Sequence, residues 1–216
     1  MGFEKGNLSV LGLTPTKGRL KYITILFIVS AILSASAFLL RMYFAKEEYT
    51  ITQSLTVKSV LLDTWYQLRT GLTEELLFRG VLLYILIKKI GQTKAIIISS
   101  IVFGLLHWIN AGVWGNPTQM ILVFIFTFVM GLLLAYSYAR TFSMLIPFAI
   151  HFGWNLTQNY IFPDTAAGNH IFTLAAPPPT VTISYFSFFT MLLLPKISVL
   201  VFDYLIVKQH RQVELP

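Results

Sequence analysis

Six apolar runs of nearly bilayer length recur along this 216-residue chain, and they constrain its fold more than any other feature. A helix needs roughly 20 apolar residues to cross about 30 Å of hydrocarbon. Hydrophobic residues make up 56% of the chain and charged residues only 12%, too few polar side chains to cover a water-soluble domain. The runs cover residues 23–40, 71–87, 95–109, 120–139, 144–162 and 181–207.

These runs predict an all-α fold, a polytopic transmembrane helix bundle of about six to seven spans. The predicted order is a basic cytoplasmic segment at 1–22, a transmembrane domain at 23–207 and a cytoplasmic tail at 208–216. The mixed segment 51–69 is either an interfacial helix or part of the next span. Residues 163–179 have the composition of an outer loop, and Pro195 predicts a kink or a break in the last span.

The positive charges predict a multi-pass protein of the cell membrane with both termini in the cytoplasm. With that orientation the inner segments carry ten lysines and arginines and the outer loops three. The inner ones are Lys5, Lys17, Arg19, Lys21, Lys88, Lys89, Lys94, Arg140, Lys208 and Arg211, and the outer ones are Arg41, Lys46 and Lys58. The formal charge of +7 is therefore explained by topology, so the lipid bilayer is the expected partner and nucleic acid is not.

Ionisable side chains within the apolar runs are candidates for function, because a charge in hydrocarbon is costly unless it is paired or lines a wet cavity. Three runs each carry polar residues of this kind: Glu74, Glu75, Arg79, His107, His151 and Asn155. The predicted topology places Glu74 and His107 toward the outer ends of their spans. The chain has no cysteine, which excludes a cysteine nucleophile and a cysteine zinc site.

Helical spacing separates the roles of the two glutamates. Glu75 and Arg79 are four apart and share a face, whereas Glu74 is turned from Arg79 by about 140°. Arg79 is therefore expected to neutralise Glu75 and to leave Glu74 for proton transfer. Phe103 with His107, and His151 with Asn155, show the same spacing of four on their own helices.

Each of these pairs also has a structural interpretation. Glu75 with Arg79, taken alone, is typical of an intrahelical ion pair. His107 beside Trp108 is typical of an anchor at the membrane interface. His151 with Asn155 is typical of hydrogen bonding between helices. Asp203 and Lys196 in the last run either pair with each other or contribute to a cavity. The coincidence of three pairs on three helices favours a functional site.

The chain resembles the CAAX protease and bacteriocin-processing family, also called CPBP or Abi, of glutamate-type intramembrane proteases. Three motifs carry the resemblance. Glu-Glu-x-x-x-Arg is matched by Glu74-Glu75-Leu76-Leu77-Phe78-Arg79, Phe-x-x-x-His by Phe103-Gly104-Leu105-Leu106-His107, and His-x-x-x-Asn by His151-Phe152-Gly153-Trp154-Asn155. The motifs follow one another in this order, each within an apolar run.

The resemblance implies a metal-independent endopeptidase in which a glutamate and a histidine activate water to hydrolyse a membrane-associated protein or peptide. The catalytic residues that it implies are Glu74, His107, His151 and Asn155, the last two holding the carbonyl oxygen. The supporting residues are Glu75, Arg79 and Phe103. With few spans, the chain is similar to the bacterial members that process peptides or bacteriocins or give immunity to them. No cofactor is implied, a homo-oligomer is allowed, and the side to which the site opens is left undecided.

Two alternatives stay open. A zinc metalloendopeptidase could use the glutamates and histidines, but neither HExxH nor HxxEH occurs and Arg79 would repel the cation, so no metal is expected. A non-catalytic scaffold or immunity protein, or a proton-coupled transporter, could instead use Glu74, His107 and His151 as a relay. Substitution of Glu74 by Gln separates these functions, because only the protease needs its base.

Overall fold

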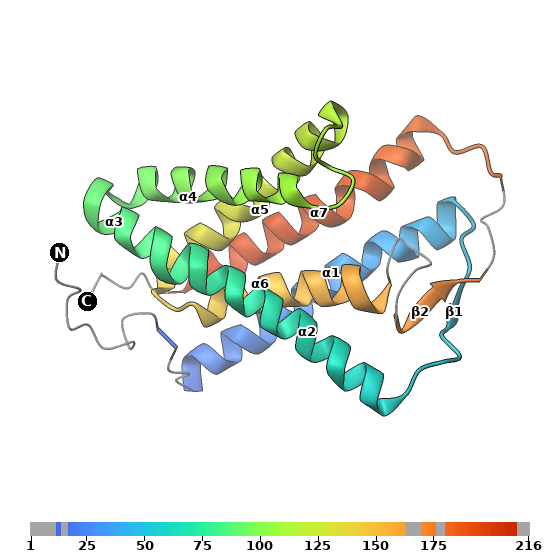
Figure 1. Ribbon diagram of the computed structural model, residues 1–216, viewed down its shortest axis with the longest axis horizontal. Helices are drawn as coiled ribbons and strands as arrows, with labels where there is room; N and C mark the ends of the chain where they lie inside the picture. Colours follow the sequence, from blue (N-terminus) through green and yellow to red (C-terminus); the bar gives the residue numbers. More distant parts are fainter. Residues whose placement is uncertain (1–11, 14–16, 163–169, 176–179, 211–216) are drawn as a thin grey trace. The chain divides into compact units, whose positions relative to one another are not determined.

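The computed structural model of the chain describes residues 12–13, 17–162, 170–175 and 180–210. These residues form six helical segments and one pair of short strands (Figure 1). Most of the predicted N-terminal segment 1–22, most of the tail 208–216 and much of the predicted loop 163–179 lie outside the described residues.

The helical segments are built from α, π and 3-10 elements. The α-helices are α1 (Lys17–Phe44), α2 (Val57–Glu75), α3 (Tyr84–Ile90), α4 (Gln92–Leu106), α5 (Pro117–Thr141), α6 (Leu145–Leu156) and α7 (Tyr185–Gln209). The π-helix η2 (Leu76–Leu83) joins α2 to α3, η4 (Thr157–Ile161) follows α6, and the 3-10 turn η3 (His107–Ile109) follows α4. Strands β1 (Tyr49–Ile51) and β2 (Phe172–Leu174) pair antiparallel, with Thr50 opposite Thr173.

Four of the described helices are long and apolar enough to cross a membrane, which makes the chain a multi-pass membrane protein. They are Gly18–Phe44, Gln92–Ile109, Pro117–Thr141 and Tyr185–Gln209. The all-α prediction is confirmed apart from the two three-residue strands, which the sequence did not predict. The count of six to seven spans stays a prediction.

The course of the helices bears on two local predictions. Residues 57–69 lie in α2, the same helix as Glu74 and Glu75, and α2 is not among the four candidate spans, so the choice between an interfacial helix and part of a span stays a prediction. The depth inferred for Glu74 from a span starting at residue 71 has to be redrawn accordingly. Helix α7 runs through Pro195, so a break at this residue is wrong, and the alternative of a kink stays a prediction.

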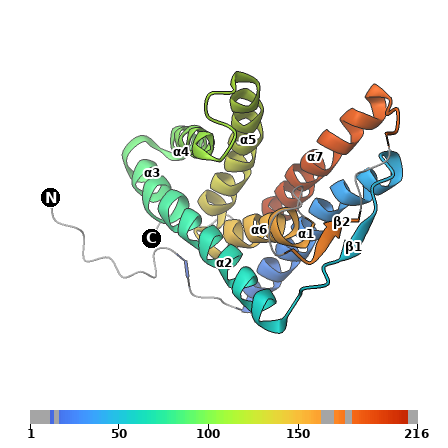
Figure 2. The ribbon, with the colours of Figure 1, turned by 45° about the vertical axis from the view of Figure 1, so that its right-hand side comes forward.

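The described residues divide into two compact units. The first takes its residues from Met1–Ile23, Thr73–Phe148 and Tyr204–Pro216. In it α3 and α4 form an antiparallel pair around Gly91, whose φ is 82°, and α4 packs along α5 (Figures 1 and 2).

Arg140 on α5 donates to the carbonyls of His210 at 3.0 Å and Lys208 at 2.9 Å. A cation thus satisfies carbonyls that the end of α7 leaves without intrahelical partners.

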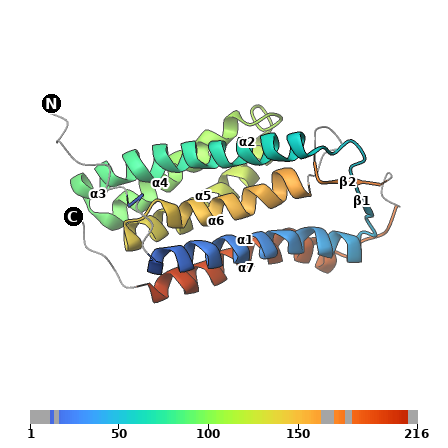
Figure 3. The same cartoon turned by 90° about the horizontal axis from the view of Figure 1, so that it is seen from below.

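The second unit takes its residues from Thr24–Leu72 and Ala149–Asp203. Helix α1 lies beside α7 (Figure 3), and Ser30 Oγ donates to Asp203 Oδ2 at 2.7 Å. Helix α6 approaches α1 at Gly153, where a Cβ would lie 2.5 Å from the Phe27 carbonyl oxygen. Only glycine permits this approach. The α1–α6 contact therefore sets the position of the residues on either side of Gly153.

Candidate functional site

The ion pair predicted within the first motif is present and buried. Arg79 Nη1 donates to Glu75 Oε1 at 2.8 Å, and both side chains are 0% exposed. Glu75 is the last residue of α2 and Arg79 lies in η2. A buried ion pair fixes geometry more than it stabilises the fold, because removing both charges from water costs about as much as their attraction returns.

The first motif ends in a π-helix rather than in the α-helix that the spacing assumed. Its i→i+5 hydrogen bonds make η2 wider than an α-turn, and such segments are common at functional sites. Arg79, in this segment, pairs with Glu75 at the end of α2, as the spacing of four predicted.

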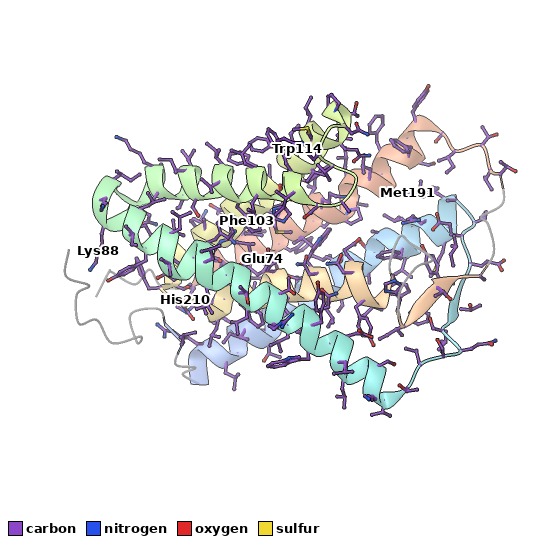
Figure 4. All side chains as sticks on the ribbon, viewed as in Figure 1. Glu74, Lys88, Phe103, Trp114, Met191 and His210 are labelled. Carbon is purple, nitrogen blue, oxygen red and sulfur yellow. The ribbon has the colours of Figure 1, made fainter. Side chains whose placement is uncertain are left out.

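Phe103 connects the first motif to the second. Its buried ring lies 4.2 Å from Arg79 Cζ, a cation–π contact, and meets the Phe78 ring edge to face at 5.1 Å. The His107 ring packs edge to face on Phe103 at 4.6 Å. One aromatic ring on α4 thus supports both the guanidinium and the imidazole. Figure 4 labels Glu74 and Phe103 on their helices.

The position of His107 at the end of α4 determines that its Nδ1 carries a hydrogen. Its Nδ1 lies 2.7 Å from the Phe103 carbonyl oxygen, one of the four carbonyls that the end of α4 leaves unsatisfied. A carbonyl only accepts, so Nδ1 carries the hydrogen and donates it. In the neutral imidazole Nε2 is then the nitrogen that accepts a proton. The spacing of four in the second motif therefore brings His107 into contact with both the carbonyl oxygen and the ring of Phe103.

The third motif lies on α6. Asn155 Nδ2 donates to His151 Nε2 at 2.9 Å, and His151 is 4% exposed. The predicted pair is present. The amide nitrogen carries a second hydrogen, which is the kind of donor that stabilises a developing negative charge on oxygen.

The structure assigns the motif residues to both units. Glu74, Glu75, Arg79, Phe103 and His107 belong to the first unit, where contacts run from Glu75 through Arg79 and Phe103 to His107. His151 and Asn155 belong to the second.

The sequence reasoning missed residues that position the motifs. On α5, Gly131 lies against Phe103, and a Cβ there would be 3.2 Å from Phe103 Cδ1. On α6, Gly153 holds the third motif against α1. A glycine within an apolar run is a weak signal of close helix approach, and it was the only one available. Within the described part of the chain, no group of three or more His, Cys, Asp or Glu side chains is arranged to hold a metal ion.

The ionisable residues of the last run bond elsewhere. Asp203 accepts from Ser30 on α1, and Lys196 Nζ donates to the Leu192 carbonyl of its own helix at 3.1 Å. Asp203 is fully buried. Its hydrogen bond joins α1 to α7, which is the role that polar residues commonly have between membrane helices.

The fold and the motifs together define a class of protein. It is a multi-pass membrane protein with a buried Glu–Arg pair, a histidine that caps the end of a helix and a His–Asn pair. The sequence model of the type II CAAX prenyl endopeptidase Rce1-like family matches residues 56–157. This stretch contains all three motifs, and it is a domain of that family, the CPBP or Abi group of the resemblance. No curated protein and no solved structure matches the chain. The family is one of membrane proteases and includes non-catalytic members.

Proposed function

We propose that this chain is an intramembrane endopeptidase that hydrolyses a peptide bond of a membrane-associated protein or peptide without a metal ion. The observation that carries the proposal is the hydrogen bond from His107 Nδ1 to the Phe103 carbonyl oxygen. It leaves Nε2 as the basic nitrogen of a ring that packing holds in place. The proposed topology has six spans with both termini in the cytoplasm, and the family domain lies within a transmembrane region at 23–207.

Glu74 is the proposed base and His107 orients the water. The water oxygen bonds to the carbonyl carbon while Glu74 takes the proton, and the π electrons of the carbonyl move to its oxygen. The carbon–nitrogen bond then breaks, and Glu74 returns the proton to the leaving nitrogen. One peptide bond and one water thus give an acid and an amine, with Glu74 again a carboxylate.

The other motif residues have supporting roles in this proposal. His151 and Asn155 stabilise the negative oxygen of the tetrahedral intermediate, a role taken from the resemblance. Glu75 and Arg79 hold the charge balance around Glu74, and Phe103 holds Arg79 and His107. A non-catalytic immunity or scaffold protein is the competing function, and a cleavage assay of the wild type and Glu74→Gln separates the two.

The test is cleavage of a quenched-fluorescent peptide library by the detergent-purified protein, with and without EDTA. Glu74→Gln and His107→Ala are each expected to lower the rate by about 10²- to 10⁴-fold, the usual contribution of a positioned acid or base. Glu48→Gln, the same change at an exposed residue, controls for loss of charge. Undiminished cleavage by Glu74→Gln would remove the proposed base, and loss of wild-type activity in EDTA would favour the zinc enzyme.

A further inference from the structure

The guanidinium of Arg79 is fully buried, yet only part of its hydrogen-bonding capacity is used. Nη1 donates to Glu75. Within the described part of the chain, Nε and Nη2 have no hydrogen-bond partner. A buried charged donor without an acceptor is expensive, and a catalytic role is one of the reasons for which native proteins retain such a group. The unused donors therefore call for an oxygen ligand.

The two unused donors lie on one edge of the guanidinium plane. The N–H groups of Nε and Nη2 point the same way, as a fork that matches two oxygens bonded to a single atom. The plane is held on two sides, by the Phe103 ring 4.2 Å from Cζ and by Glu75 on Nη1. The fork is thus held in one orientation before any ligand binds.

We propose that the Nε–Nη2 edge of Arg79 binds both oxygens of the carbon under attack, which makes Arg79 a catalytic residue in addition to its pairing with Glu75. This inference rests on the proposed peptidase function. The two oxygens are the former carbonyl oxygen, which takes the π electrons, and the oxygen delivered by water. Both remain on that carbon after the carbon–nitrogen bond breaks, as the product carboxylate. Arg79 gains and loses no proton in any step.

The fork favours the tetrahedral intermediate over the substrate. A peptide carbonyl offers one uncharged oxygen, whereas the intermediate offers two with a net negative charge. Only interactions that are stronger in the transition state accelerate the reaction, so loss of the fork should lower kcat and leave KM nearly unchanged. A purely structural role of Arg79 in pairing with Glu75 predicts no such difference between the effects on kcat and on KM.

The test is binding of a phosphinic peptide, whose tetrahedral phosphorus carries two oxygens and a negative charge, measured by calorimetry on the detergent-purified protein. Arg79→Lys retains a cation for Glu75 but has no fork, and Arg69→Lys, the same change at an exposed residue of α2, is its matched control. We expect Arg79→Lys to lower both probe affinity and kcat by about 100-fold. We expect Arg69→Lys to change neither.

A second measurement uses the unaltered protein and so does not depend on the folding of a variant. The methyl ester of the same probe has one oxygen masked, and it should bind about 100-fold more weakly than the acid. Equal probe affinity in wild type and Arg79→Lys, or no wild-type binding, would overturn the fork. Arg79-dependent probe binding by a protein that cleaves no peptide would instead retain the fork and refute the peptidase.

Discussion

Gly131 offers a perturbation of the candidate site at a residue outside the three motifs. A Cβ at this position on α5 would lie 3.2 Å from Phe103 Cδ1 and 3.2 Å from Ser100 Cα and Cβ on α4. These distances are shorter than ordinary carbon–carbon contacts, so the Phe103 ring or the α4 backbone must shift by a few tenths of an ångström. Overpacking of this kind costs about 1–3 kcal/mol of folding free energy.

The catalytic effect of Gly131→Ala should exceed what its destabilisation explains. Phe103 supports Arg79 with its ring and His107 with both ring and carbonyl, so its displacement moves the proposed catalytic groups. A misplacement of about 1 Å can cost roughly 100-fold in rate, so a few tenths of an ångström should cost about tenfold in kcat.

Gly104→Ala is the matched control for this prediction. It adds the same methyl group to the same α4–α5 interface, where it would meet the Phe124 ring at 3.0 and 3.1 Å. Phe124 packs on Trp108 and Phe128. Both variants are measured for unfolding in detergent and for kcat on one fluorescent peptide. Equal kcat in the two variants at equal destabilisation would refute the positioning role of Phe103.

Three further predictions concern the second unit and the topology. Gly153→Ala places a Cβ 2.5 Å from the Phe27 carbonyl, so it should destabilise the protein by about 1–3 kcal/mol in denaturant unfolding; an unchanged midpoint would contradict the close approach. Asp203→Ala removes the hydrogen bond to Ser30 and should cost about 1 kcal/mol, while Asp203→Asn keeps an acceptor and should cost less; equal losses would argue against that bond. Because the chain has no cysteine, single cysteines introduced at positions 46 and 208 show by their reaction with an impermeant maleimide on which side of the membrane each position lies. The predicted orientation places position 46 outside and position 208 inside, so labelling of position 208 in intact cells would contradict it.

The sequence predicted the parts of the fold whose signal is local. Long apolar runs indicated α1, α4, α5 and α7, because hydrocarbon requires them. The spacing of four predicted the Glu75–Arg79 and His151–Asn155 pairs, because residues one helical turn apart meet.

Other features depend on contacts that the sequence does not display. Lys58, Asp63 and Arg69 interrupt the hydropathy of the 57–90 helical stretch, so its beginning could not be read from apolar residues. No residue pattern marks the π-helix η2, in which Arg79 lies. The strands β1 and β2 are three residues each and pair across a separation of more than a hundred residues. Their pairing is tertiary, and neither segment predicts it alone.

The central claim, that Glu74 activates water as a base, is tested most directly by a single turnover in oxygen-18-labelled water with EDTA present. The protein is used in excess over its best-cleaved peptide, and the carboxylate product is analysed by mass spectrometry. Direct attack by water predicts one heavy oxygen in the product of the first turnover, and no product from Glu74→Gln. An unlabelled first product would show that an oxygen of the protein attacked instead, and labelled product from Glu74→Gln would show that Glu74 is not the base.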